Sequence, residues 1–100
     1  MDTATAPAAA APTALTWDTA TLAEAIGLAD GGSTVREAAA ALRQRFAPLR
    51  VVVVDAFDMR GEAPAIAGSR RALYFGSSDG HCWQVTQDPA QVSGLFVVDR

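Results

Sequence analysis

Residues 73–86 read LYFGSSDGHCWQVT, and this stretch decides the fold. Two short apolar runs flank the residues Gly-Ser-Ser-Asp-Gly, a pattern typical of a β-hairpin. The same segment holds the chain's only tyrosine, only histidine and only cysteine, with one of its two tryptophans. We therefore predict a hairpin here, and we expect most side chains with specific chemistry to lie on it.

Strand alternation determines which side chains of the predicted hairpin share a face. A two-residue loop pairs Tyr74 with Val85, whereas a four-residue loop that begins at the first serine pairs Tyr74 with Trp83. Both registers place Tyr74, Trp83 and His81 on one face and Cys82 on the other. His81 and Cys82 therefore cannot act together as base and nucleophile, and a Cys–His catalytic pair is excluded.

For Cys82, His81 and Trp83 we first expect a structural role. We expect Cys82 to be a small buried side chain, because free cysteine is among the most buried residue types. His81 lies next to the turn, where Asp79 is in a position to orient its ring. We expect Trp83 to pack across the strands and to cover Gly76.

Two helices are predicted before the hairpin. Residues 17–30 carry apolar side chains at helical spacing, with Thr16 or Asp18 as the N-cap. Residues 34–37, Thr-Val-Arg-Glu, form a capping box that starts a second helix, which Pro48 ends. The buried stripe of this second helix consists of Val35, Ala38, Ala39, Leu42 and Phe46.

The rest of the chain supplies strands and connections. Residues 49–56 contain four successive valines and predict a central strand with both faces covered. Residues 57–71 predict a long connection with a short extended piece at 64–67. Residues 88–91, Asp-Pro-Ala-Gln, predict one helical turn, and residues 95–99 a last strand. The chain is thus an α+β domain, with two N-terminal helices on one face of a mainly antiparallel sheet of about four strands.

Composition limits the classes of function. Residues 1–14 are almost entirely Ala, Thr and Pro and predict a disordered tail, which leaves residues 15–100 as one domain. The net charge is −3 and arginines are scattered, which disfavours nucleic-acid binding. No apolar run is long enough for a membrane span. A single cysteine and no export signal indicate a cytoplasmic protein.

The chain resembles a small uncharacterised family of proteobacterial proteins associated with nitrogen-fixation gene neighbourhoods. The resemblance covers residues 34–100, and it rests on RVVVVDAFDMR (50–60), LYF (73–75), DGHCW (79–83) and DP (88–89). It implies a cytoplasmic accessory role, through contact with nitrogenase or with its assembly and electron-transfer proteins. It brings no catalytic residue or ligand.

Two hypotheses of function remain, because the sequence has no catalytic, cofactor or metal motif. The first is a non-enzymatic module that binds another protein through the hairpin or the long connection, with Tyr74, Asp79, His81, Trp83, Asp58 and Arg60 as the candidate surface. The second is a small-molecule or metal-binding protein, or an enzyme, that uses Asp55, Asp58, Asp79 and His81 around one pocket. A homo-oligomer paired through a strand edge is compatible with either.

Overall fold

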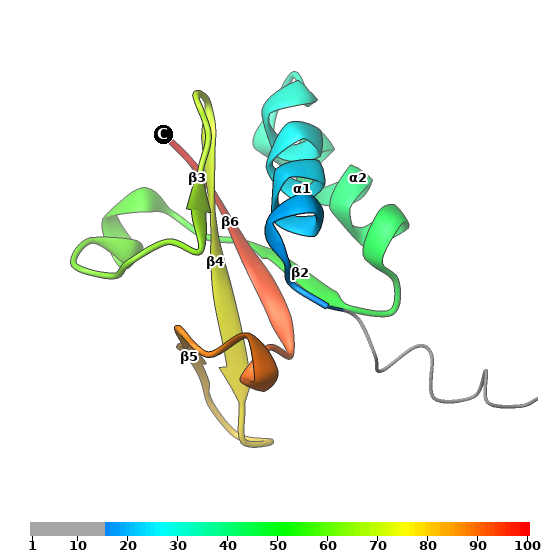
Figure 1. Cartoon of the computed structure of the whole chain (residues 1–100). Helices are drawn as coiled ribbons and strands as arrows, with labels where there is room; N and C mark the ends of the chain where they lie inside the picture. Colours follow the sequence, from blue (N-terminus) through cyan, green and yellow to red (C-terminus); the bar gives the residue numbers. More distant parts are fainter. Residues whose placement is uncertain (1–15) are drawn as a thin grey trace, which may run out of the picture.

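The computed structural model describes residues 16–100, so the predicted tail at 1–14 lies outside the described residues. Two helices and a mixed five-stranded sheet make up this part of the chain (Figure 1). The elements are, in chain order, α1 (Thr19–Gly31), α2 (Val35–Phe46), β2 (Arg50–Val53), η2 (Ala56–Met59), β3 (Ile66–Ala67), β4 (Arg71–Ser78), β5 (Trp83–Val85), η3 (Pro89–Gln91) and β6 (Gly94–Asp99).

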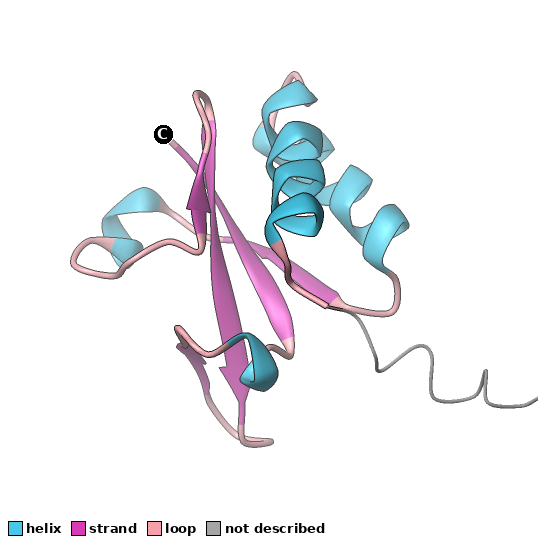
Figure 2. Ribbon diagram, in the orientation of Figure 1, coloured by secondary structure: helices cyan, strands magenta, loops and turns pink. Residues whose placement is uncertain are grey.

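The sheet has the order β2-β6-β4-β3, and β5 pairs with β4 as well. The β2–β6 pair is parallel, while the pairs that β4 makes with β3, β5 and β6 are antiparallel. Both helices lie on one side of the sheet (Figure 2). The predicted α+β class is therefore confirmed, with one more strand than expected. Neither helix of residues 16–100 has the length and apolar character needed to cross a bilayer.

The starts of both helices follow from side chains at their caps. Asp18 caps α1 by accepting a hydrogen bond of 2.8 Å from the Thr21 amide, and this bond lowers the pKa of the Asp18 carboxyl. Thr34 caps α2 by accepting from the Glu37 amide at 3.1 Å. The Glu37 carboxylate in turn accepts from the Ser33 amide. The capping box thus forms as predicted, with the reciprocal bond one residue earlier than usual.

The valine-rich strand is not central, and this prediction is wrong. β2 lies at the edge of the sheet, while β6 and β4 occupy the centre. Val51 is buried, whereas Val52 and Val53 are 37% and 39% exposed. A run of valines shows that both faces of a strand are apolar, but the number of neighbouring strands depends on residues elsewhere in the chain. The two central strands are instead formed by residues 94–99 and 71–78.

The long connection is more ordered than expected. Asp55 caps the single turn η2 by accepting from the Phe57 amide at 2.7 Å. The short extended piece at 64–67 is present as β3, which pairs with the start of β4. The predicted turn at Asp88 also forms, because the Asp88 side chain accepts from the Ala90 amide at 2.9 Å.

The two faces of the sheet bury separate apolar clusters. Between sheet and helices, the ring of Trp17 lies 5.4 Å from the rings of both Phe46 and Phe75. On the opposite face, Tyr74 and Phe96 pack with Met59 of η2, so this short turn covers part of the sheet that the helices leave open. Burying both faces is what gives a domain of this size its stability.

A buried arginine joins the end of α1 to the sheet. The Arg71 side chain is almost fully buried, and its guanidinium donates to the carbonyl oxygens of Ala29 and Gly32 at 3.0 and 2.7 Å. The same group donates to the Asp99 carboxylate at 2.7 Å. The buried charge is therefore paired and hydrogen-bonded, as a buried charge must be.

Candidate interaction surface

The hairpin forms, with a register that differs from both predicted ones. Gly76 pairs with Val85 and Ser78 with Trp83, which leaves a four-residue turn at 79–82. Because the register shifts by an even number of residues, each side chain of the two strands stays on its predicted face, and Tyr74 and Trp83 share a face as predicted. The strand continues past Gly76 because this glycine lies opposite Gly94 of β6, beneath aromatic rings that leave no space for a larger side chain.

The turn is held by its own polar side chains. The Asp79 carboxylate accepts from the backbone amides of His81 and Cys82 at 2.9 and 3.0 Å. These bonds, first that from Cys82 and then that from His81, lower the pKa of Asp79. The Ser78 hydroxyl accepts from the Gly80 amide at 3.1 Å, and Gly80 has a φ of +98°, a conformation that favours glycine. The expected contact of Asp79 is therefore corrected: it binds the His81 backbone instead of orienting the ring.

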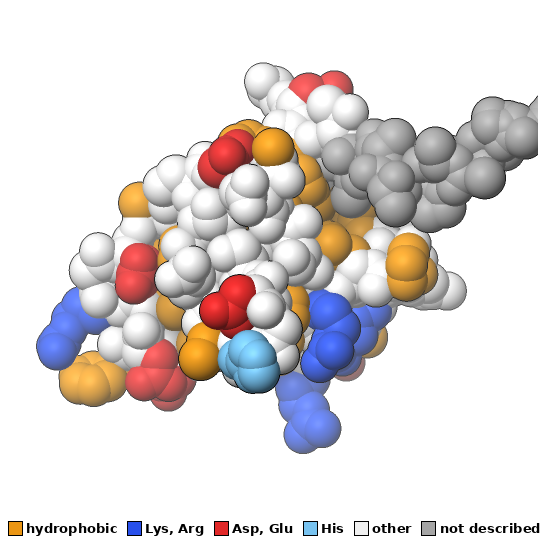
Figure 3. All heavy atoms as spheres, turned by 90° about the horizontal axis from the view of Figure 1, so that it is seen from below, with side chains coloured by type: hydrophobic (Ala, Val, Ile, Leu, Met, Phe, Trp, Pro, Cys, Tyr) orange, Lys and Arg blue, Asp and Glu red, His pale blue; other side chains and the backbone are white. Residues whose placement is uncertain are grey.

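Two side chains of the hairpin have different exposures from those expected. Cys82 is exposed, which corrects the prediction of a buried cysteine. It lies in the turn and not in a strand, so no sheet neighbour covers it. Tyr74 is buried against the core and contributes packing instead of a recognition surface. Figure 3 views the molecule from the hairpin end, with the histidine in pale blue at the surface.

Trp83 covers Gly76 as predicted, and it covers Gly94 as well. Its ring lies 6.0 Å from the ring of Phe96 in an edge arrangement. A Cβ added at Gly76 or at Gly94 would approach ring carbons of Trp83 to 3.2 or 3.1 Å, so the indole lies directly over both glycines. Even so, Trp83 is 38% exposed. One side of the indole is fixed by packing, and the rest of it is open to a partner.

The candidate residues of the long connection form a separate exposed group. Asp58 and Arg60 are both exposed, and the Arg60 guanidinium lies 4.4 Å from the ring centroid of Phe57. Phe57 is 67% exposed, the most exposed of the large apolar side chains in residues 16–100. Its exposure was not predicted from the sequence. The available signal was Asp55, two residues earlier, which caps a single turn whose only buried residue is Met59.

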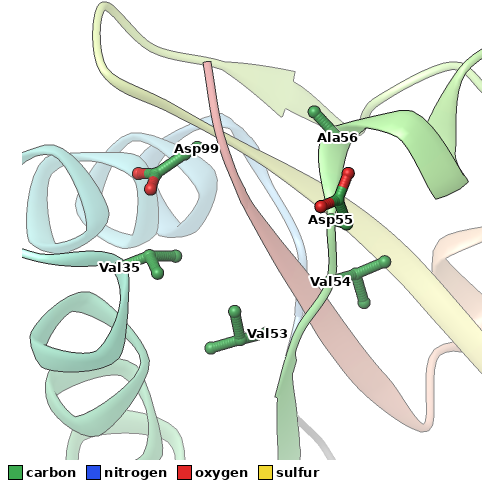
Figure 4. Close-up of a pocket in the computed structure, with 6 residues that line it drawn as sticks. All are labelled: Val35, Val53, Val54, Asp55, Ala56 and Asp99. Carbon is green, nitrogen blue, oxygen red and sulfur yellow. The ribbon is translucent and has the colours of Figure 1, made fainter.

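The acidic residues do not converge with His81. Figure 1 shows η2 beside the middle of the sheet, away from the end that carries the hairpin turn. Residues 16–100 contain no group of three His, Cys, Asp or Glu side chains placed to hold a metal ion. Asp55 instead lines a pocket with Asp99, where Figure 4 shows the two carboxylates on either side of β6. Each already accepts a structural hydrogen bond, Asp55 from the Phe57 amide and Asp99 from Arg71.

Comparison with family models, with curated proteins and with solved structures finds no match for this chain. The case for a function therefore depends on the exposed groups themselves.

Proposed function

We propose that this chain is a non-enzymatic protein-interaction module that binds another protein through the hairpin turn and Trp83. The observation that carries the proposal is the partly exposed indole, fixed over Gly76 and Gly94 beside a turn that Asp79 holds rigid. A preorganised aromatic side chain loses little entropy on binding, and tryptophan is enriched among the residues that dominate interface energies.

The resemblance to the nitrogen-fixation-associated family extends this proposal to a class of partner. In that reading the chain is a bacterial cytoplasmic accessory protein, and the partner is nitrogenase or one of its assembly or electron-transfer proteins. The metal-binding or enzymatic alternative has no comparable support, because Asp55 and Asp58 lie apart from Asp79 and His81.

Binding variants test the proposal. The full chain is used to capture its partner from a lysate of a nitrogen-fixing bacterium, and the captured protein is purified for titration calorimetry. We expect Trp83→Ala to weaken binding by about tenfold or more, since truncation of a hot-spot residue costs about 2 kcal/mol. His81→Ala should weaken binding less and leave the fold intact, because its side chain is exposed.

Phe57→Ala is the matched control, since it truncates an exposed aromatic side chain on the other candidate group. Unchanged affinity for Trp83→Ala and for His81→Ala would contradict the hairpin proposal. A loss confined to Phe57→Ala would assign the interaction to the long connection instead.

A further inference from the structure

The outer edge of β2 presents unpaired backbone groups. The Val54 amide donates to the Val97 carbonyl of β6 at 3.0 Å, so even-numbered residues of this segment direct their backbone groups inward. Because these groups alternate sides along a strand, Val51 and Val53 direct theirs outward. Among residues 16–100, no strand pairs with this edge. An exposed strand edge is a template for an added strand.

The side chain of Arg43 in α2 hydrogen-bonds to one of the outward groups. Its Nε and Nη2 atoms donate to the Val51 carbonyl oxygen at 3.1 and 2.9 Å. The remaining outward groups are the amides of Val51 and Val53 and the Val53 carbonyl, and within residues 16–100 these groups make no hydrogen bond. Val51 itself is buried, whereas Val53 is 39% exposed. The edge is therefore open at Val53 and closed at Val51, where the exposed side chain of Arg43 holds the carbonyl.

A groove runs along this edge, between β2 and α2. One part of it, of about 600 Å³, is lined by Arg36, Arg43 and Val53. The adjoining part is lined by residues that include Arg43, Arg50 and Val51. The side chain of Val53 is exposed at the floor, so the groove offers apolar surface between an arginine-bearing helix and a row of backbone groups.

The charge of these two parts of the groove is positive, and no carboxylate lines either of them. The neighbouring pocket that shares Val53 is lined by Asp55 and Asp99. Within residues 16–100, the ion pairs involve Arg45 and Arg71, whereas Arg36, Arg43 and Arg50 have no carboxylate partner. Three unpaired arginines along one groove, in a chain of net charge −3, form a local site for carboxylates.

We propose that the edge of β2 captures an extended acidic segment of another protein. The segment adds to β2 as a strand through the outward groups of Val51 and Val53, and its carboxylates contact Arg36, Arg43 and Arg50. On binding, Arg43 turns from the Val51 carbonyl to a carboxylate of the segment, which releases this carbonyl for a backbone amide. This surface is separate from the hairpin of the proposed function and stands independently of it.

A second copy of this chain fits the same edge poorly. Two β2 strands paired antiparallel about Val52 would place each Val51 opposite the partner's Val53. That pairing needs the Val51 carbonyl that Arg43 holds, and it brings the two Arg43 guanidinium groups together without a carboxylate between them. Like charges facing each other disfavour this arrangement, whereas an acidic segment removes the same repulsion.

The test uses the full chain, isotope-labelled, and three fluorescent peptides with alternating sequence. The probe is Thr-Glu repeated, and the controls are Thr-Gln and Thr-Lys of equal length. We expect the Glu peptide to bind at least tenfold more tightly than either control, with an affinity that falls as salt is raised. Amide exchange should slow at Val51 and Val53 on binding, while Val52 and Val54, already bonded to β6, serve as internal references.

Variants connect this binding to the groove. Arg43→Gln should lower the affinity for the Glu peptide by about tenfold, because a charge-assisted contact is lost. Arg45→Gln is the matched control, because it makes the same charge change on the same helix where Glu24 already neutralises the arginine. Val53→Pro should abolish binding, since it removes an outward amide that the β2–β6 ladder does not use. If Val53→Pro fails to fold, Arg43→Gln with its control decides alone.

Several results would overturn the proposal. These are equal binding of the three peptides, slowed exchange elsewhere than at Val51 and Val53, or tighter binding by Arg43→Gln, which would make this arginine only a shield. Binding of a single-stranded oligonucleotide in place of the Glu peptide would assign the groove to nucleic acid. Exchange protection at Val51 and Val53 that rises with concentration of the free protein would assign it to a second copy.

Discussion

Asp30 provides the sharpest test of how the helices are fixed to the sheet. Its Oδ1 accepts from the amides of Arg70 and Arg71 at 3.0 and 2.9 Å, and its Oδ2 accepts from the Ser69 amide at 3.0 Å and from the Ser69 hydroxyl at 3.3 Å. The carboxylate therefore holds the whole turn before β4 against the end of α1. Gly68 permits this approach, since an added Cβ there would collide with both carboxylate oxygens.

The expected cost of Asp30→Ala can be estimated bond by bond. Water replaces the carboxylate at Ser69 and Arg70, which are exposed, so each of these bonds contributes about 0.5–1.5 kcal/mol. The Arg71 amide belongs to a buried residue, and leaving it unsatisfied costs about 1–3 kcal/mol. Removal of a negative charge from a helix C-terminus returns about 0.3–1 kcal/mol. We therefore expect a net loss of about 2–4 kcal/mol in the free energy of unfolding.

Asp30→Asn tests the hydrogen bonds of the carboxylate while a side chain of similar size stays in place. An amide oxygen at the Oδ1 position retains the bonds from Arg70 and Arg71, while the amide nitrogen opposes the Ser69 amide. The loss in the free energy of unfolding should accordingly be half of that expected for Asp30→Ala, about 1–2 kcal/mol.

The difference in the free energy of unfolding between wild type and Asp30→Asn should also depend on pH. Desolvation by itself raises the pKa of Asp30, but the backbone amides of Arg70, Ser69 and Arg71 outweigh it and hold the pKa below its ordinary value. A carboxyl whose pKa is lower folded than unfolded stabilises the fold above the unfolded value, about 3.9, and loses this as pH falls through the folded value. The difference should therefore be constant near neutral pH and shrink below about pH 4.

Urea unfolding measures these effects, with far-UV circular dichroism and with the fluorescence of buried Trp17 as probes. The slope of the transition should be unchanged in the variants, so that midpoints report stability alone. A loss below about 1 kcal/mol for Asp30→Ala would refute the reasoning, because it is less than the unsatisfied Arg71 amide alone should cost. Equal losses for Asn and Ala would refute the assignment of two bonds to each oxygen.

Two further predictions concern close packing and buried charge. Gly76→Ala places a Cβ 2.9 Å from the Phe96 ring and 3.2 Å from Trp83, so we expect a loss of about 1–3 kcal/mol and displacement of the indole, measured by urea unfolding and by tryptophan emission; unchanged emission would contradict the position of Trp83. Arg71→Met leaves the carbonyls of Ala29 and Gly32 without their donor, and we expect a loss of about 2–4 kcal/mol by thermal and urea unfolding. A stabilised Arg71→Met variant would show that apolar packing outweighs this pair.

Local features of the fold could be predicted because they depend on residues a few positions apart. Asp18 and Thr34 cap their helices through amides three residues later, and Asp88 caps its turn through an amide two residues later. Strand alternation decides which side chains of the hairpin share a face. That prediction is correct although the predicted register is wrong, because the two registers differ by an even number of residues. The register itself was missed because His81 and Cys82 were assigned to the second strand, whereas their amides donate to the Asp79 carboxylate and lie in the turn.

The candidate surface was predictable only in part. The positions of Asp79, His81 and Trp83 near one turn follow from the sequence alone. The burial of Tyr74 and the exposure of Cys82 and Phe57 do not, because each depends on which distant segment covers the side chain.

The sequence by itself determined two capped helices, a hairpin with Trp83 and Tyr74 on one face, and the α+β class. The tertiary structure alone decided that β2 lies at an edge, that Arg43 covers its Val51 carbonyl, and that Asp30 fastens a turn about forty residues away. The physical reason is the range of the interactions. Caps and alternation act within a few residues, whereas edge position, burial and long-range carboxylate contacts arise only when segments distant in the chain are packed together.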